Sequence, residues 1–518
     1  MNPLLYAGLV VLYVVVMLAV GYWCMKRTKS VGDFFLGGRS LGPWMSAFAY
    51  GTTYFSAVLF IGYAGSLGWG FGIHTMWIVI GNTFIGTLLA WLVLARRTRE
   101  MTARLNALTM PEFLRARYDS MPLQVISALV VFVFLVPYSA SVYMGLSYLF
   151  QKTLGLQYNQ ALFFLAGLTG VYLVMGGYFA VAISDFIRGI VEFLGVLIMV
   201  VLLAGMKGGL GASFTALLDP KYAPALHTPL PPPGPQFQGW VKLWSLVLIT
   251  SFGPWALPQM VQKFYSIRSQ ADVKRAMTIA TIFALFMSFG AYYSGALTHL
   301  FFTNPTTDLA PIMGAAKKPN LDLLMPFFIV TYVPQWLVLI ILLMVFSASM
   351  SSLSSLVLVS SSAIAIDIYG AYSHRDQKQK QTVRLMRVLC AVFVLLSLSI
   401  ALKQFDVIVN LMVIAWGALS GAFLAPYVYG LFWRRATKAG AYASLLCGIG
   451  IAVGLFLYWG KPFIPVAGAI AMVAPLLVMP IVSLLTPAPD EAHVTKCFPP
   501  ATAKESTNPK FGSMASVK

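Results

Sequence analysis

The feature that most constrains this sequence is the recurrence of apolar stretches from one end of the chain to the other. Each is about 20 residues long, which is what a helix needs to cross a bilayer core of about 30 Å. Hydrophobic residues make up 59% of the 518 and charged residues only 10%, whereas a soluble domain has about 25% charged residues. Because only helices and closed barrels satisfy their backbone hydrogen bonds in lipid, the sequence predicts an all-α polytopic membrane protein.

Apolar runs separated by polar loops predict thirteen membrane spans. We expect them at residues 4–24, 43–66, 74–96, 121–150, 159–178, 182–206, 240–262, 276–302, 323–368, 385–402, 407–432, 438–459 and 463–486. Loops on one side hold many basic residues, among them Arg96, Arg97, Lys263 and Arg268, and loops on the other side hold fewer. Because basic loops stay in the cytoplasm, we expect a bacterial inner-membrane protein with its N-terminus outside and its C-terminus inside.

The charge and the cysteines limit the possible partners. A net charge of +19 could attract nucleic acid, but the basic residues are spread over short loops and form no single patch with interleaved aromatic residues. We therefore expect the lipid bilayer, and no nucleic acid, as a partner. The four cysteines lie far apart without metal-ligand spacing, so neither a zinc site nor a disulfide framework is expected.

Two segments are expected to carry no chemistry. Residues 207–239 contain the run Pro-Pro-Pro-Gly-Pro at 231–235, which predicts a stiff, solvated loop on the outer face. Residues 487–518 are rich in Pro, Ala, Lys and Ser, which predicts a disordered cytoplasmic tail.

Ionisable residues inside a membrane are expensive and are therefore functional candidates. Here they concentrate in the span at 182–206, where Asp185, Arg188 and Glu192 are spaced by three and four residues. This spacing places them on one helical face, so Arg188 can pair with either acid. One interpretation is a self-neutralising structural triad, and the other gives Asp185 a bound cation.

Hydroxyl groups concentrate in the span at 323–368. Ser351, Ser352 and Ser355 share one helical face with Ala348. Serines in membrane helices usually serve close packing, but Na⁺, like other hard cations, prefers oxygen ligands. Freed backbone carbonyls would complete such a site, and the glycine-interrupted segment 51–57 of the second span is a candidate broken helix. Together these features predict an ion-coupled carrier.

Four sequence segments resemble those of a known family, the sodium:solute symporters, and especially its proline and pantothenate branch. The likeness covers about residues 5–485, and its most specific segments are Phe34–Pro43, Ala107–Phe113, Gly176–Asp185 and Met350–Tyr369. It implies a LeuT-type fold of two inverted five-helix repeats. The expected parts are an additional N-terminal helix and cytoplasmic loop (1–42), the repeats (43–206 and 240–432), and two additional C-terminal helices (433–486).

The resemblance also implies where sodium binds. The first site would use three backbone carbonyls and two hydroxyls, those of Thr52, Phe55, Ala348, Ser351 and Ser352. Some members, notably sialic-acid carriers, bind a second Na⁺ through an Asp and three serines. Those positions hold Asp185, Ser351, Ser354 and Ser355 here.

One residue departs from the family pattern at this second site. Members commonly have Gln where this chain has Arg188. A second sodium ion would compete with Arg188 if Arg188 pairs with Asp185, and pairing with Glu192 would relieve the conflict. Whether one or two Na⁺ are coupled stays open.

Four residues are candidate solute contacts: Tyr138 by the resemblance, Ser56 because it lies just past the break in the second span, and the aromatic Phe252 and Trp255 as walls of the site. Tyr138 aligns with a tyrosine that proline carriers use near the substrate. The Trp and Tyr that proline carriers place in the seventh span are Thr250 and Pro254 here. The residues that the sugar and sialic-acid branches use are absent, which argues against those solutes.

The sequence therefore predicts a secondary active Na⁺-coupled symporter that imports a small organic solute by alternating access. An amino acid such as proline, pantothenate and a monocarboxylate are the candidate solutes. A proton-coupled amino-acid carrier on the same fold, with Asp185 as proton relay, is the alternative. A membrane-embedded enzyme is a weaker alternative, because it needs positioned catalytic groups and the five histidines are scattered outside the expected midplane.

Overall fold

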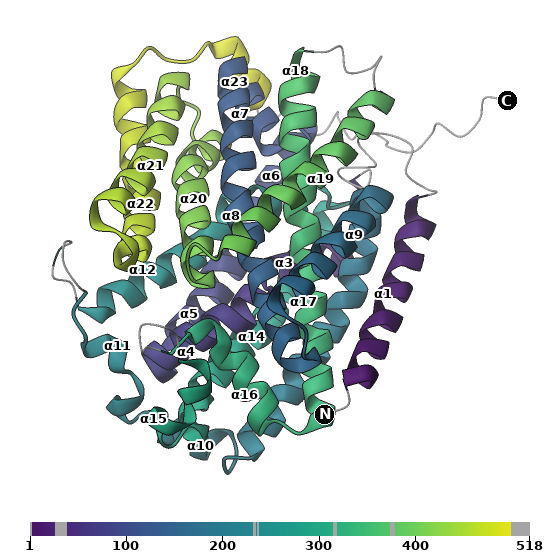
Figure 1. Ribbon diagram of the computed structural model, residues 1–518. Coiled ribbons are helices and arrows are strands. Elements are labelled where there is room, and N and C mark those ends of the chain that lie inside the picture. Colours follow the sequence, from purple (N-terminus) through teal and green to yellow (C-terminus); the bar gives the residue numbers. More distant parts are fainter. Residues whose placement is uncertain are drawn as a thin grey trace.

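The computed structural model is helical over nearly all of the residues it describes, which are 3–25, 39–230, 235, 238–313, 319–372 and 379–498. Figure 1 shows long helices packed side by side, with short helices at both ends of the bundle. The described residues contain ten helices long and apolar enough to cross a membrane, and shorter apolar helices at Tyr6–Val20 and Leu321–Tyr332. The expectation of an all-α protein with many membrane spans is confirmed.

The helices of the first half follow the expected spans closely. They are α1 (Pro3–Met25), α3 (Pro43–Tyr54), η2 (Val58–Tyr63), α4 (Ala64–Phe71), η3 (Gly72–Thr75), α5 (Met76–Ile80), η4 (Gly81–Leu89), η5 (Trp91–Ala95), α6 (Arg96–Arg104), α7 (Met110–Tyr118), α8 (Met121–Leu154) and α9 (Tyr158–Gly205). The outer loop that follows contains α10 (Leu210–Ala216), η6 (Pro220–Tyr222) and α11 (Pro224–His227). The run at 231–234 lies outside the described residues.

The second half begins after that loop. It contains α12 (Gly239–Phe252), η7 (Gly253–Trp255), α13 (Pro258–Tyr265), α14 (Gln270–Phe301), α15 (Pro305–Asp308), η8 (Ala310–Ile312), η9 (Leu321–Leu323), α16 (Leu324–Tyr332), α17 (Gln335–Ile364), η10 (Ala365–Tyr369), α18 (Gly370–Tyr372), α19 (Gln379–Lys403), α20 (Ile408–Phe432), α21 (Lys438–Trp459), η12 (Lys461–Phe463), α22 (Ile464–Leu485) and α23 (Glu491–Cys497). The boundaries of the two inverted repeats stay a prediction.

Helix α9 covers two of the expected spans, 159–178 and 182–206, in 48 residues. Thr169 contacts Met350 on α17, and Asp185 accepts a hydrogen bond from the next residue of α17, Ser351. A straight helix would separate positions 169 and 185 by about 24 Å. Helix α9 is continuous over both expected spans, and it therefore bends between these two residues. No proline or charged residue falls between 159 and 184, but this stretch contains the adjacent glycines 176 and 177, which weaken a helix.

Basic and proline-containing loops lie at opposite ends of the bundle. Helices α7, α18 and α23 are at one end, and α10, α11, α15 and α16 are at the other (Figure 1). The loops that we expect in the cytoplasm are thus together, and so are those that we expect outside. The start of α1 and the C-terminal α23 also lie at opposite ends. The number and direction of the membrane crossings stay predictions of the sequence.

The expectation of a disordered tail at 487–518 differs from the structure in its first part. Asp490 caps α23 by accepting from the backbone N–H of His493. Arg104 donates to the carbonyl of Cys497 at 2.8 Å, and Arg434 donates to that of Phe498 at 3.2 Å. These bonds satisfy carbonyls at the helix end, which is why a polar segment is ordered here. The rest of the tail lies outside the described residues.

Small residues allow two central helices to cross closely. A Cβ built at Gly68 of α4 would lie 2.5 Å from the carbonyl carbon of Gly295 on α14, and one at Gly295 would overlap the backbone of Ala64. Such contacts let helices pack without a hydrophobic driving force in lipid. Next to this crossing, Gly72 has a φ of +53°, a conformation that favours glycine, and it turns the chain back after α4.

Candidate sodium and substrate sites

The second span is broken where the sequence predicts it. Helix α3 ends at Tyr54, Phe55 is extended with φ −109° and ψ 124°, and η2 begins only at Val58. The hydroxyl of Ser56 accepts from the backbone N–H of Val58 at 3.2 Å, so a side chain replaces a missing helical bond. The break leaves carbonyls of the last turn of α3 available to other groups.

Those carbonyls face the serine-rich part of α17. The hydroxyl of Ser352 is 3.2 Å from the carbonyl oxygens of both Thr52 and Thr53. The hydroxyls of Ser351 and Thr52 are hydrogen-bonded at 2.8 Å. Ala348 lies one turn before Ser352 on α17, and all of these residues are buried. The donor set is uncharged oxygen from backbone and hydroxyl groups, which suits a hard cation such as Na⁺.

The second expected site is only partly assembled. Ser351 donates to Oδ1 of Asp185 at 2.7 Å, and Ser355 lies 3.0 Å from the hydroxyl of Thr53. Ser354 instead donates to the carbonyl of Met350 on its own helix at 2.6 Å. The structure thus brings Asp185, Ser351 and Ser355 into one cluster, and Ser354 bonds outside it.

A residue that the sequence analysis placed in a cytoplasmic loop completes this cluster. Lys263 lies in α13 with no exposed surface, and its ammonium donates to Ser355 at 3.0 Å. It is also 3.8 Å from Oδ2 of Asp185. The expectation for Lys263 was wrong because α13 follows a break in the seventh span and runs on inside the protein. The signal that could have found it is the apolar context Met260-Val261 and Phe264 around a lone lysine.

Arg188 pairs with Asp185. Its spacing in the sequence also allowed a pair with Glu192. Its Nη1 is 3.7 Å from Oδ1 of Asp185, and both side chains are at most 1% exposed. Glu192 is also fully buried, and neither of its carboxylate oxygens has a hydrogen-bond partner among the described residues. The structure therefore shows the pairing of Arg188 that would compete with a second sodium ion at Asp185.

One of the four expected solute contacts, Tyr138, packs against a residue that the sequence analysis missed, Trp416 of α20. The ring of Tyr138 packs on Trp416 edge to face at 5.9 Å, and Tyr54 stacks on it at 6.0 Å. A Cβ at Gly253 would lie 2.7 Å from the Trp416 ring. A tryptophan set among small residues, Gly417 and Ala418, was the available signal.

The remaining expected contacts lie at the two helix breaks that border Trp416. Phe252 and Trp255 flank Gly253 and pack on each other at 5.5 Å. Trp255 also donates to the carbonyl of Ile85 at 3.0 Å, so its ring is held in place. Ser56 follows Phe55, whose ring stacks on Tyr54 at 4.4 Å. Ser56 thus lies at the break of the second span, and Phe252 and Trp255 lie at that of the seventh.

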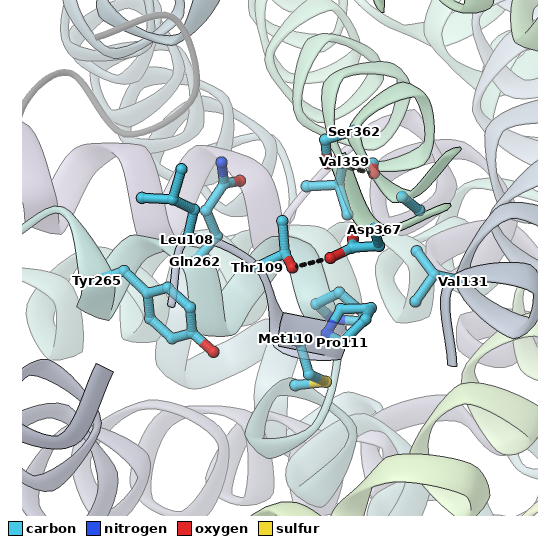
Figure 2. Close-up of a pocket in the computed structure, with 12 residues that line it drawn as sticks. Leu108, Thr109, Met110, Pro111, Val131, Gln262, Tyr265, Val359, Ser362 and Asp367 are labelled. Carbon is cyan, nitrogen blue, oxygen red and sulfur yellow. Dashed lines mark hydrogen bonds between the residues drawn. The ribbon is translucent and has the colours of Figure 1, made fainter. Parts of the chain in front are cut away.

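A small cavity lies further along α17, between the ion cluster and the end of the bundle that we expect in the cytoplasm. Figure 2 shows Gln262 and Tyr265 of α13 on one side and Val359 and Ser362 of α17 on the other. Its volume is about 10 Å³, room for about one water. Beside it the hydroxyl of Thr109 donates to Asp367, and Gln124 donates to the same carboxylate oxygen at 3.2 Å. These bonds join α7, α8 and η10 across the inner side.

Side chains that could bind a metal ion are spread out in the described part of the chain. It contains no group of three or more His, Cys, Asp or Glu side chains that could hold a metal ion. Two of the histidines instead make ring contacts: His299 stacks on Trp69 at 4.1 Å, and His74 packs on Trp240 at 5.2 Å.

Comparisons with known proteins agree with this geometry. The chain is 27% identical over 494 residues to the osmoregulated proline transporter OpuE of Bacillus subtilis, covering 93% of this chain and 95% of that protein. It is 28% identical over 444 residues to the sodium/proline symporter of Escherichia coli, covering 84% of each. The whole length of the bundle is therefore shared with bacterial transporters.

Solved structures show the same fold. A Na⁺-coupled sialic acid symporter in a substrate-bound outward-open state superposes with a TM-score of 0.75, at 20% identity, covering 94% of this chain and 98% of that one. Mhp1, a nucleobase-cation-symport-1 family transporter in a closed conformation, gives 0.52 at 14% identity, covering 89% and 97%. The LeuT-type fold is thereby confirmed.

The model of the sodium:solute symporter family matches residues 34–448, which include both helix breaks and all of the ion cluster. With the apolar helices and the bacterial relatives, this match makes the protein a multi-pass inner-membrane carrier that couples a small organic solute to sodium. The chain belongs to the sodium:solute symporter family.

Proposed function

We propose that this protein imports a small solute that bears a carboxylate, with proline as the first candidate, on one Na⁺ bound between α3 and α17. The relatives named above carry proline, and proline, pantothenate and monocarboxylates share a carboxylate group. The observation that carries the ion site is the Ser352 hydroxyl set between the carbonyls of Thr52 and Thr53 at the break of α3.

The proposed sodium ligands are the carbonyls of Thr52, Phe55 and Ala348 and the hydroxyls of Ser351 and Ser352. Because these belong to two helices, bound Na⁺ stabilises the approach of α3 to α17. The proposed solute contacts Ser56 and Tyr138 lie beside the same break. Ion and solute then stabilise one arrangement of the broken helix, and such coupling is reciprocal: each raises the affinity for the other.

We propose that the cycle involves no covalent chemistry. In alternating access the site opens first to one side and then to the other. The bonds among Thr109, Gln124 and Asp367 close the inner side beside the small cavity. Their separation would open a path from the ion cluster to the cytoplasm along Val359 and Ser362 of α17.

The proton-coupled alternative assigns Asp185 the role of a relay. The carboxylate already lies within ion-pair distance of Arg188 and Lys263 and accepts from Ser351. A proton bound to this carboxylate would leave two buried basic side chains without their paired charge. This observation supports sodium as the coupling ion.

Uptake into proteoliposomes tests the proposal. Radiolabelled proline, pantothenate and lactate are offered in turn, under an inward gradient of Na⁺, of K⁺, or of protons without Na⁺. We expect accumulation of at least one carboxylate solute only with the sodium gradient. Accumulation driven equally well by protons would contradict sodium coupling, and uptake only of solutes without a carboxylate would contradict the solute class.

A further inference from the structure

The side chain of Lys263 ends among residues that belong to other helices. Its ammonium contacts Ser355 of α17 at 3.0 Å and Asp185 of α9 at 3.8 Å. All three side chains are buried, Lys263 and Asp185 fully and Ser355 to within 1%. A buried ammonium is stable only when an opposite charge and hydrogen-bond acceptors compensate its lost hydration. Asp185 and Ser355 therefore form a binding position for a cation.

This position coincides with the second sodium site that the family resemblance implies. Of its four ligands, Asp185 and Ser355 are the two groups that the ammonium contacts. Ser351 donates to the other carboxylate oxygen of Asp185, and Ser354 bonds to its own helix. The groups that would coordinate a second ion are therefore engaged by residues of this chain.

The buried charges point the same way. Asp185 and Glu192 are acidic, Arg188 and Lys263 are basic, and none of the four is more than 1% exposed. Two basic groups, Arg188 and Lys263, already lie within ion-pair distance of the carboxylate of Asp185, so a sodium ion added there would leave an excess of positive charge in a low-dielectric interior. The proposed ligands of the first site, in contrast, are uncharged hydroxyl and carbonyl oxygens.

We propose that the Lys263 ammonium is a tethered cation that takes the place of a second sodium ion at Asp185, so that this carrier couples one Na⁺ to each solute. The inference rests on the proposed function, since it presupposes sodium at Thr52 and Ser352. A tethered cation stays with α13 throughout the cycle. It contributes no driving force, and it keeps the second half of the broken seventh span joined to α9 and α17 where the inner cavity begins.

The sodium dependence of solute uptake at fixed membrane potential tests this inference. Purified wild-type protein, Lys263→Ala and Lys263→Arg are compared in proteoliposomes. For the wild type we expect a hyperbolic sodium curve with a Hill coefficient of about 1. Lys263→Ala frees Asp185 and Ser355 for a second ion, so its curve should become sigmoidal, with a Hill coefficient approaching about 2. Lys263→Arg keeps a cation at the position and should stay hyperbolic.

The double variant Lys263→Ala with Asp185→Asn separates ion binding from a general defect. Removing the carboxylate from the freed site should return the curve to hyperbolic. If Lys263→Ala keeps full uptake and a hyperbolic sodium curve, Lys263 does not occupy an ion position. For the case that the lysine variants do not fold, binding of radioactive sodium to the wild type gives a second readout. We expect saturation at one ion per chain.

The outcomes distinguish the inference from the function on which it rests. Two sodium ions bound per wild-type chain, or a sigmoidal wild-type curve, would overturn the tethered cation and leave sodium coupling intact. Uptake that is indifferent to sodium would overturn the proposed function itself.

Discussion

Two clusters on the same face of α17 lie one turn apart and differ in what surrounds them. At Ser352 the neighbours are backbone carbonyls and hydroxyls from the broken end of α3. At Ser355 the neighbour is the ammonium of Lys263, beside the Asp185–Arg188 pair. Both clusters have the residue types that the resemblance implies for sodium ligands. If Lys263 replaces an ion as we propose, the difference teaches that ligand type is not sufficient, because a charge from a third helix decides whether an ion is needed.

The largest effect should follow from removing the acid that both cations share. In Asp185→Ala, Lys263 and Arg188 keep their burial and lose their carboxylate, which typically costs about 3–5 kcal/mol. We expect a large drop in the melting temperature of the detergent-purified protein, and partial recovery in the double variant with Lys263→Met. A melting temperature equal to that of the wild type would mean that the cluster carries no net stabilisation.

The next largest effect should be on sodium affinity at the other cluster. Ser352→Ala removes a hydroxyl between two carbonyls, and the loss of one such ligand, about 1–3 kcal/mol, raises the sodium half-saturation by about 5- to 150-fold. Ser349→Ala is the matched control, because its buried hydroxyl bonds only back to Val345 of the same helix. Equal sodium half-saturation in both variants and the wild type would exclude Ser352 from the site.

A smaller effect should separate the solute region from both ion clusters. Trp416→Phe keeps an aromatic ring beside Tyr54 and Tyr138 but reduces its area. Aromatic pairs are worth about 0.5–1.5 kcal/mol beyond burial, so we expect the KM for the solute to rise by about 2- to 10-fold. Trp433→Phe, at the residue that follows the last turn of α20, is the control. An unchanged KM with a reduced thermal stability would make Trp416 a packing residue only.

The smallest effect should come from an ion pair in water. Lys221 hydrogen-bonds Asp219 on the outer loop and holds the pKa of this exposed carboxyl below its usual range. Any stabilisation is present above the unfolded-state pKa and fades as the pH falls through the folded-state pKa. Exposed pairs contribute little, so Asp219→Asn should leave melting temperature and uptake unchanged at neutral pH. A clear loss in either would contradict this contrast with Asp185.

Much of the fold could be predicted because apolar length and loop composition act locally. The apolar runs mark where helices occur, and the glycine-containing segment at 51–57 marks the break of α3. The spans at 159–178 and 182–206 were expected from their length to be separate, and the structure joins them in one helix, α9. The order in α23 was missed because its partners, Arg104 and Arg434, are distant in the chain.

The candidate site was predictable only for the residues that share a helix face or a family motif. Ser351 and Ser352 were found by periodicity and resemblance, and the structure brings them to Thr52. Lys263 and Trp416 were missed for one physical reason. Each acts on residues of other helices, and neither periodicity nor spacing within one span reports a contact between helices.

The most direct test of the account is the ratio of sodium to solute in the wild type. Proteoliposomes are loaded with solute, the potential is held at zero, and the opposing sodium gradient at which net solute flux stops is measured. With one coupled ion, flux stops when the sodium ratio equals the solute ratio. With two ions, it would stop when the solute ratio equals the square of the sodium ratio. We predict equality; a square relation would contradict the tethered cation, and a balance point independent of sodium would contradict the symporter itself.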